Sequence, residues 1–107
     1  MATIDEFLQI DLRIGKIVEV NEIATRKPMY GLKVDLGELG TRSIVAGIKE
    51  KYTIDELLGR RVIVVANLEP KNIAGTLSEG MLLAAENNGE LSLLQPDKEL
   101  AEGSRVR

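Results

Sequence analysis

Apolar and polar residues alternate along much of the chain with the two-residue period that is typical of β-strands. The clearest example is residues 30–36, where every second side chain is apolar: Tyr30, Leu32, Val34 and Leu36. Lys33 and Asp35 fall on the opposite face. A turn bracketed by two glycines leads from this segment into residues 42–48, which predict a second strand paired with the first.

An earlier segment, residues 10–20, follows the same period with one interruption. Leu12, Ile14 and Val18 are separated by even numbers of residues, which predicts a shared apolar face. Gly15 lies inside this run. We therefore expect a long strand that bends or bulges at Gly15.

Two short helices are predicted by the same start signal. In residues 3–6, and again in residues 53–56, a threonine precedes a glutamate by three positions. This is the capping box, in which the hydroxyl and the carboxylate satisfy free backbone N–H groups of the first helical turn. Gly59 is expected to end the second helix after about two turns.

The second half of the chain adds two strands, a loop and a hairpin. Residues 62–66 are all apolar, which is typical of a central strand. Residues 71–79 are mostly polar and predict a loop. Residues 80–86 predict a further strand, and Asn88-Gly89 is a type I′ turn signal that pairs it with residues 90–94.

This order of elements predicts an all-β OB-fold, a five-stranded β-barrel with a short helix between strands three and four. An N-terminal helical turn and a C-terminal β extension complete it. We expect a single domain over residues 1–107, with its core at about 11–87 and an extension at 88–107. An SH3-like barrel is the main alternative, and the capped segment at Thr53 argues against it.

Composition restricts the chemistry that such a domain could perform. The chain has no Cys and no His, which excludes disulfides, thiolate nucleophiles, zinc-thiolate sites and histidine bases. Two pairs of carboxylates remain, but Asp55 and Glu56 suit the first turn of a helix, and Asp97 and Glu99 lie in a polar tail. We therefore expect a binding module with no catalytic residues, no metal site and no cofactor.

The chain also lacks signals for a membrane or for export. Its longest apolar run, residues 62–66, has five residues, whereas a membrane helix needs roughly 18. The N-terminal residues 1–6 are acidic and unlike a signal peptide. These features predict a cytoplasmic protein without a membrane partner.

Charge is distributed unevenly. The net charge is −3, yet residues 26–71 hold nine basic and six acidic side chains, while residues 72–102 hold one Lys and six acids. A polyanion responds to the local potential, so the basic middle of the chain is compatible with phosphate binding. An ordinary solvated surface with uneven statistics is the other interpretation.

OB-folds bind ligands across strands two and three and the loops beside them. In this chain the polar residues of those elements are Arg26, Lys27, Lys33, Arg42, Lys49, Lys51, Asn67, Lys71, Asn72, Ser78 and Glu79. Lys and Arg contact phosphates, while Asn and Ser bond to sugar hydroxyls and base edges. Lys71 is the first candidate, because no carboxylate follows it until Glu79. Only Tyr30 and Tyr52 could stack bases, and Tyr30 is in phase with the core, which favours a folded RNA over a single strand.

Five segments in register span nearly the whole chain: Asp11-Leu-Arg-Ile-Gly-Lys-Ile-Val-Glu-Val20, Leu32-Lys-Val-Asp-Leu-Gly37, Ile44-Val-Ala-Gly47, Val64-Val-Ala-Asn-Leu68 and Ser78-Glu-Gly-Met-Leu-Leu-Ala-Ala85. Together they resemble the tRNA-binding domain family, found at the C-terminus of methionyl-tRNA synthetases and in free-standing tRNA-binding proteins. The resemblance implies structure-specific, sequence-nonspecific tRNA binding, by a homodimer or by a trans-acting or C-terminal domain (beta subunit) of a methionyl-tRNA synthetase. It also implies RNA contacts by Arg42, Asn67, Lys71, Ser78, Glu79 and Met81.

Residues 23–30 depart from the synthetase type. Members of that type carry a His-Pro…Asp-Lys-Leu stretch here, whereas this chain reads Ile-Ala-Thr-Arg-Lys-Pro-Met-Tyr, which resembles the CsaA-type secretion chaperone of the same fold. The alternative function is therefore a chaperone that binds polypeptides, with Arg26 and Lys27 not engaged on tRNA. Residues 80–85 and Asn88-Gly89 side with the synthetase type and favour tRNA.

Apolar residues at the two ends of the chain predict a homodimer. Phe7-Leu8 and the group Leu91, Leu93 and Leu94 supply more apolar surface than a five-stranded barrel can bury. A two-fold interface would cover it. The alternative is that these side chains plug the ends of the barrel.

Overall fold

Short strands make up most of the ordered structure, as the all-β prediction requires. The computed structural model describes residues 1–107. Its elements are α1 (Ile4–Leu8), β1 (Leu12–Ile23), β2 (Met29–Asp35), a 3-10 turn (Gly37–Leu39), β3 (Thr41–Ala46), α2 (Ile54–Leu57), β4 (Arg61–Val65), β5 (Lys71–Ile73), β6 (Thr76–Ser78), β7 (Met81–Leu82), β8 (Ala84–Asn87), β9 (Glu90–Leu93) and β10 (Arg105–Val106). The longest helix has five residues, so no helix has the length and apolar character that crossing a bilayer requires.

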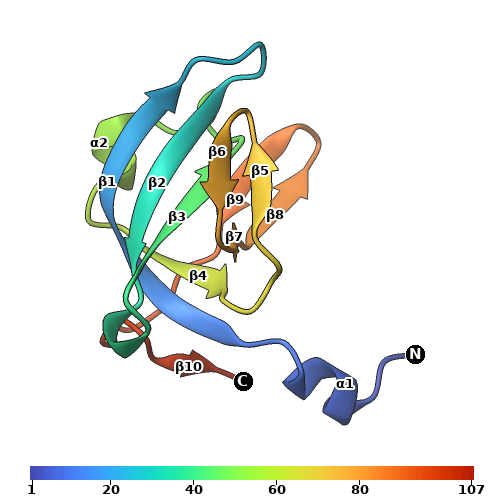
Figure 1. The fold of residues 1–107 in the computed structure, drawn as a ribbon. Helices are drawn as coiled ribbons and strands as arrows, with labels where there is room; N and C mark the ends of the chain where they lie inside the picture. The colour runs from blue at the N-terminus through green and yellow to red at the C-terminus, as the bar shows by residue number, and fades with distance from the viewer.

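One antiparallel sheet with the strand order β3-β2-β1-β4-β7 curls around the core (Figure 1). Its free edge at β3 is met by the end of β6. There the Glu79 N–H donates to the Ser43 carbonyl oxygen at 2.7 Å, and the Val45 N–H donates to the Ser78 Oγ at 3.0 Å. These bonds close the curl into the predicted OB-type barrel, with α2 between β3 and β4.

The core fills the inside of the curl, and the alternation predicted for β2 is confirmed. Tyr30, Leu32, Val34 and Leu36 are all buried. Tyr30 serves the core, as its phase indicated, and its hydroxyl donates to the Tyr52 carbonyl oxygen at 2.9 Å. Strand β4 is buried along Val62–Val65, which agrees with its prediction as a central strand.

The bulge in β1 lies at Val18 and not at Gly15, where the sequence predicted either a bend or a bulge. The register of β1 against β2 shifts between Ile17 and Glu19. A bulge reverses which face the following residues present. Val20 is therefore buried in the same core as Ile17. Val18 continues the outer face of Leu12 and Ile14 and is 48% exposed, although its even spacing predicted a buried side chain.

A close approach between strands explains Gly15. This residue pairs regularly with Val62 of β4, at the point where β1 turns from β4 toward β2. A Cβ at Gly15 would lie 2.5 Å from the Val34 Cγ1 and 2.8 Å from the Leu36 Cδ2. Only glycine lets the strand cross these two fully buried side chains.

Residues 71–79 form a β-hairpin in place of the predicted loop. Strands β5 and β6 pair from Lys71 with Ser78 to a turn at Ala74 and Gly75, whose φ angles are 51° and 83°. The Asn72 Oδ1 accepts the Gly75 N–H at 3.1 Å and fixes this turn. A single glycine in a short polar segment is a weak turn signal, which is why sequence alone did not resolve it.

Two other predicted elements have different extents. The strand expected over residues 80–86 divides into β7, which pairs with β4, and β8, which pairs with β9 in a separate two-stranded sheet. The turn at Asn88-Gly89 is confirmed, with φ angles of 51° and 80°. Helix α2 has four residues, shorter than the predicted two turns, because Leu58 has already left helical geometry with ψ at 126°.

Both predicted capping boxes are present. In α2 the Glu56 N–H donates to the Thr53 Oγ1 at 3.2 Å, and the Glu56 Oε1 accepts the Thr53 N–H at 2.9 Å. Thr3 and Glu6 repeat the arrangement in α1. Bonds from the threonine backbone N–H, and then from its hydroxyl, stabilise the ionised carboxylates and hold the pKa of Glu6 and Glu56 below the ordinary value.

The capping box of α2 makes the free energy of unfolding depend on pH, because folding lowers the pKa of Glu56. A pKa lowered by folding stabilises the folded state above the unfolded pKa, and the contribution is lost as the pH falls through the folded pKa. In an NMR titration we expect the Glu56 carboxyl to titrate below its ordinary range, and part of that depression to disappear in Thr53→Ala. Glu6, whose partner is Thr3, is the internal control. A Glu56 titration unchanged by the substitution would contradict this account.

Candidate nucleic-acid interface

A groove of about 400 Å³ lies on the side of the sheet formed by β2, β3 and the two connections that flank them. One flank is the end of β1 that leads into β2, and the other is the β5–β6 hairpin (Figure 1). The side chains and main chain that line it include Asn21, Glu22, Ile23, Gly31, Lys33, Ser43 and Thr76. This position is the ligand face expected for an OB-fold.

The cations on the elements around this groove have no carboxylate partner. Every ion pair in the structure uses one of three other cations, namely Arg13, Lys49 and Arg61. The unpaired cations are Arg26 and Lys27 between β1 and β2, Lys33 on β2 and Lys71 at the start of β5. Arg42 on β3 also has no carboxylate partner, but its guanidinium is bonded to the Ala66 carbonyl oxygen. Their charge is therefore available to a polyanion, although the whole chain is acidic.

The carboxylates near the same face have partners of their own. Glu22 lines the groove, and the Lys49 Nζ lies 3.2 Å from its Oε1. The Glu79 Oε1 accepts the Ser43 N–H at 3.3 Å. Lys49 is thus partly neutralised. Lys51, the other basic candidate on this stretch, donates its Nζ to the Gly89 carbonyl oxygen at 2.8 Å.

Several predicted site residues use their polar atoms to hold the fold together. Ser78 is buried, and its Oγ accepts the Val45 N–H and donates to the Gly80 carbonyl oxygen at 3.3 Å. The Asn72 side chain is bound in the hairpin turn. Met81 lies on β7 with 48% of its surface exposed and does not line the groove.

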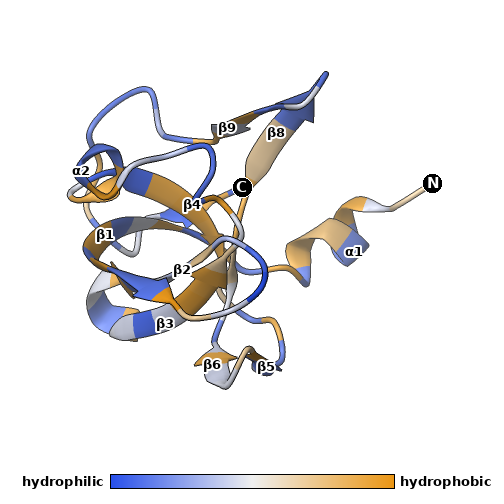
Figure 2. Ribbon diagram, turned by 90° about the horizontal axis from the view of Figure 1, so that it is seen from above, coloured by the Kyte–Doolittle hydropathy of each residue, from blue (hydrophilic) through white to orange (hydrophobic).

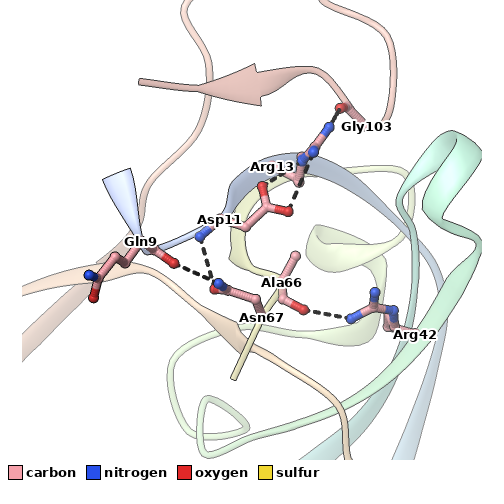
Figure 3. A network of polar contacts seen from close by, with 7 residues as sticks. All are labelled: Gln9, Asp11, Arg13, Arg42, Ala66, Asn67 and Gly103. Carbon is pink, nitrogen blue, oxygen red and sulfur yellow. Dashed lines mark hydrogen bonds and ion pairs between the residues drawn. The ribbon is translucent and has the colours of Figure 1, made fainter. Parts of the chain in front are cut away.

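Asn67 and Arg42 belong to a polar network that joins the N-terminal segment to the barrel (Figure 3). The Asn67 Oδ1 accepts the Asp11 N–H at 2.8 Å, and its Nδ2 donates to the Gln9 carbonyl oxygen at 2.7 Å. The Arg42 Nη1 donates to the Ala66 carbonyl oxygen at 2.7 Å. The Asn67 amide is therefore committed to the main chain, whereas Arg42 keeps its Nη2 and Nε without protein partners.

Of the twelve residues that the sequence indicated for RNA contacts, only Lys33 lines the groove itself. Its Nζ donates to the Ser43 Oγ at 2.5 Å. The polar residues that sequence reasoning missed here are Asn21, Ser43 and Thr76. Gly31 in the middle of β2 was the available signal, because a glycine inside a strand often marks a place where a ligand approaches the backbone.

The apolar ends of the chain have different environments. Leu93 is buried in the main core, and Leu91 packs against it, so these two follow the plug alternative. Helix α1 has no buried residue, and Phe7 and Leu8 are 41% and 49% exposed. Figure 2 shows α1, with its hydrophobic stretches, standing away from the curled sheet. No group of three or more acidic side chains lies close enough together to hold a metal ion.

Comparison with known proteins gives one family. A family model described as "Putative tRNA binding domain" matches residues 12–105. The methionine–tRNA ligases of Thermococcus kodakarensis and Pyrococcus furiosus are 50% and 52% identical over 103 residues, which is 96% of this chain. The chain spans only 14% of the length of each of these ligases.

Solved structures match over the full length. The CsaA chaperone protein from Picrophilus torridus superposes with a TM-score of 0.93 at 36% identity and covers 100% of both chains. A MetRS-related protein from Pyrococcus horikoshii superposes with a TM-score of 0.92 at 34% identity, over 100% of this chain and 98% of that one. A protein described as a CsaA chaperone and one described as MetRS-related therefore share the fold of this chain.

Proposed function

The chain belongs to the tRNA-binding domain family, and from that premise we propose that it binds folded tRNA through the sugar–phosphate backbone, without reading the nucleotide sequence. The family is a binding module that is not catalytic by itself. The observation that carries the proposal is the set of unpaired cations around the groove: Arg26, Lys27, Lys33 and Lys71. Phosphate contacts of this kind supply affinity and position without carrying sequence information.

The proposed protein partner of this chain is a methionyl-tRNA synthetase. The methionine–tRNA ligases similar to this chain match it over only 14% of their own length. A module of this size, appended to a catalytic subunit or acting in trans, would raise the affinity of the synthetase for tRNA by holding the RNA at a second point. The proposal carries with it a location in the cytoplasm, where tRNA is charged.

A homodimer would give one RNA two such faces. Support for the dimer comes from the exposed apolar side chains Ile4, Phe7 and Leu8 of α1, together with Leu94, which is 42% exposed. With Leu91 and Leu93 inside the barrel, the interface is centred on α1. We expect sedimentation equilibrium at micromolar concentration to give twice the chain mass of 11.7 kDa. A species of 11.7 kDa would remove the dimer from the proposal without touching the RNA face.

The test of the function compares three ligands in one binding assay: folded tRNA, the same tRNA unfolded, and an unstructured polypeptide. We expect the protein to prefer folded tRNA. Its affinity should fall with salt by a log–log slope of about −0.7 to −0.9 for each phosphate contacted, hence roughly −3 for four cations. A preference for the polypeptide, with no binding of tRNA, would contradict the proposal and support the second candidate function. That candidate, a chaperone, is favoured by the full-length match to CsaA proteins.

A further inference from the structure

The centre of the groove is a place where the sheet carries no side chain. Gly31 of β2 pairs with Asn21 of β1 and with Val45 of β3, so all three face the same side of the sheet. The atoms nearest to a Cβ at Gly31 would be the Ile23 Cδ1 at 3.3 Å, the Ile23 Cγ1 at 3.5 Å and the Asn21 carbonyl oxygen at 4.0 Å. The result is a short strip of accessible main chain at Gly31, bordered by the apolar side chains of Ile23 and Val45.

Polar groups of four kinds surround this strip, one of which is the Glu22 carboxylate, paired with Lys49. The Lys33 Nζ provides a cation and is steadied by the Ser43 Oγ. The Asn21 Nδ2 donates to the Glu19 Oε2 at 2.8 Å, which leaves the Asn21 Oδ1 free to accept a hydrogen bond. Thr76, from the β5–β6 hairpin, adds a hydroxyl that can donate or accept. A cation, an acceptor, a hydroxyl and the paired carboxylate of Glu22 thus border one strip of main chain.

No aromatic ring is available to act as a platform on this face. The Tyr30 hydroxyl is bonded inside the core, and the Tyr52 hydroxyl accepts the Leu93 N–H at 3.0 Å. A planar ring that docks on the sheet must therefore lie on a surface with no side chain in the way, and the strip at Gly31 is such a surface.

We propose that the groove takes one unstacked nucleotide of the RNA, with its base on the Gly31 main chain between Ile23 and Asn21 and its phosphate on Lys33. The inference rests on the proposed function and deepens it. Folded RNAs expose unstacked bases in their loops and bulges, and these bases are recognised by flat contacts and by hydrogen bonds to their edges. A volume of about 400 Å³ lies at the small end of the range of roughly 300–1,000 Å³ for small-molecule sites, which suits one nucleotide.

The first experiment uses the wild-type protein and needs no tRNA. Adenosine and uridine 5′-monophosphates are titrated into ¹⁵N-labelled protein, with ribose 5-phosphate and inorganic phosphate as matched probes without a base. We expect the nucleotides, and not the other two, to shift the amide signals of Gly31, Ile23 and Ser43. Equal shifts from inorganic phosphate would make the groove a simple anion site and overturn the proposal.

The second experiment compares two glycine variants. Gly31→Val fills the strip, whereas Gly47→Val adds the same atoms where no atom lies within 4 Å of a Cβ. We expect Gly31→Val to weaken tRNA binding at least tenfold while the salt slope stays unchanged, because Lys33 is retained. Gly47→Val should change affinity less than twofold.

The outcomes separate this inference from the function on which it rests. If Gly31→Val binds tRNA like the wild type, the nucleotide site is wrong and tRNA binding by the cations stands. If the wild type does not bind tRNA at all, the proposed function fails. Should Gly31→Val fail to fold, the nucleotide titration of the wild type decides alone: no base-dependent shift at Gly31 overturns the site.

Discussion

Replacing Leu57 by alanine should lower the free energy of unfolding by about 2–5 kcal/mol, the range expected when a fully buried leucine is truncated. Leu57 is 0% exposed and is the only buried residue of α2. It packs into the main core together with Leu32, Val34 and other strand residues. Its loss leaves a cavity and removes the contact that holds α2 to the sheet.

Chemical or thermal unfolding measures this effect, and the neighbouring residue supplies the control. Leu58 is 46% exposed, so Leu58→Ala removes the same atoms and should change the free energy of unfolding by no more than about 0.5 kcal/mol. For Leu57→Ala, a loss of about 3 kcal/mol corresponds to a fall in Tm of roughly 12–24 °C. Equal effects of the two substitutions would mean that α2 is not anchored as described.

Local signals account for the parts of the fold that sequence predicts well. The capping boxes at Thr3 and Thr53 and the turn at Asn88-Gly89 involve residues that bond to neighbours a few positions away. The alternation of β2 is predicted correctly for the same reason, because successive side chains of a strand point to opposite faces of the sheet. Such features require no knowledge of where the rest of the chain lies.

Non-local packing decides the features that sequence did not give. The bulge at Val18 and the role of Gly15 depend on how β1 leaves β4 and joins β2, and neither strand adjoins that part of β1 along the chain. The hairpin of β5 and β6 is likewise supported by contacts with β3, more than 30 residues earlier. A glycine in a strand signals that something is unusual there, but not which strand approaches it.

The candidate site divides along the same line. Composition and fold class pointed to the face of the barrel that carries the groove, because OB-folds use one face for many ligands. They could not distinguish side chains whose polar atoms are free to bind a ligand from side chains whose polar atoms are hydrogen-bonded to the main chain. Asn67 suits RNA contacts by type, yet its amide is bonded to Gln9 and Asp11, 58 and 56 positions away. Lys49 directly precedes Glu50 in the chain, yet the structure pairs it with Glu22, 27 positions away.

Replacing Arg26, Lys27 and Lys71 together by alanine should weaken tRNA binding by roughly 500-fold at about 0.1 M salt. Each phosphate contact contributes about 0.9 logarithmic units of affinity at that concentration, and three contacts contribute about 2.7. The log–log salt slope should fall in magnitude by between about 2 and 3 units. None of the three side chains has an ion-pair partner, so their removal leaves no carboxylate unpaired.

A second triple variant separates local potential from net charge. Lys98, Arg105 and Arg107 also lack ion-pair partners, and they lie in the C-terminal tail. The tail strand β10 pairs with Leu12 and Arg13, at the opposite end of β1 from the groove. Replacing them by alanine changes the net charge from −3 to −6, as the first variant does, because each removes three positive charges. If RNA is held at the groove, only the first variant loses the affinity. An equal loss of tRNA affinity in the two variants would mean that binding follows the net charge of the whole molecule, and it would contradict the assignment of the RNA site to this face.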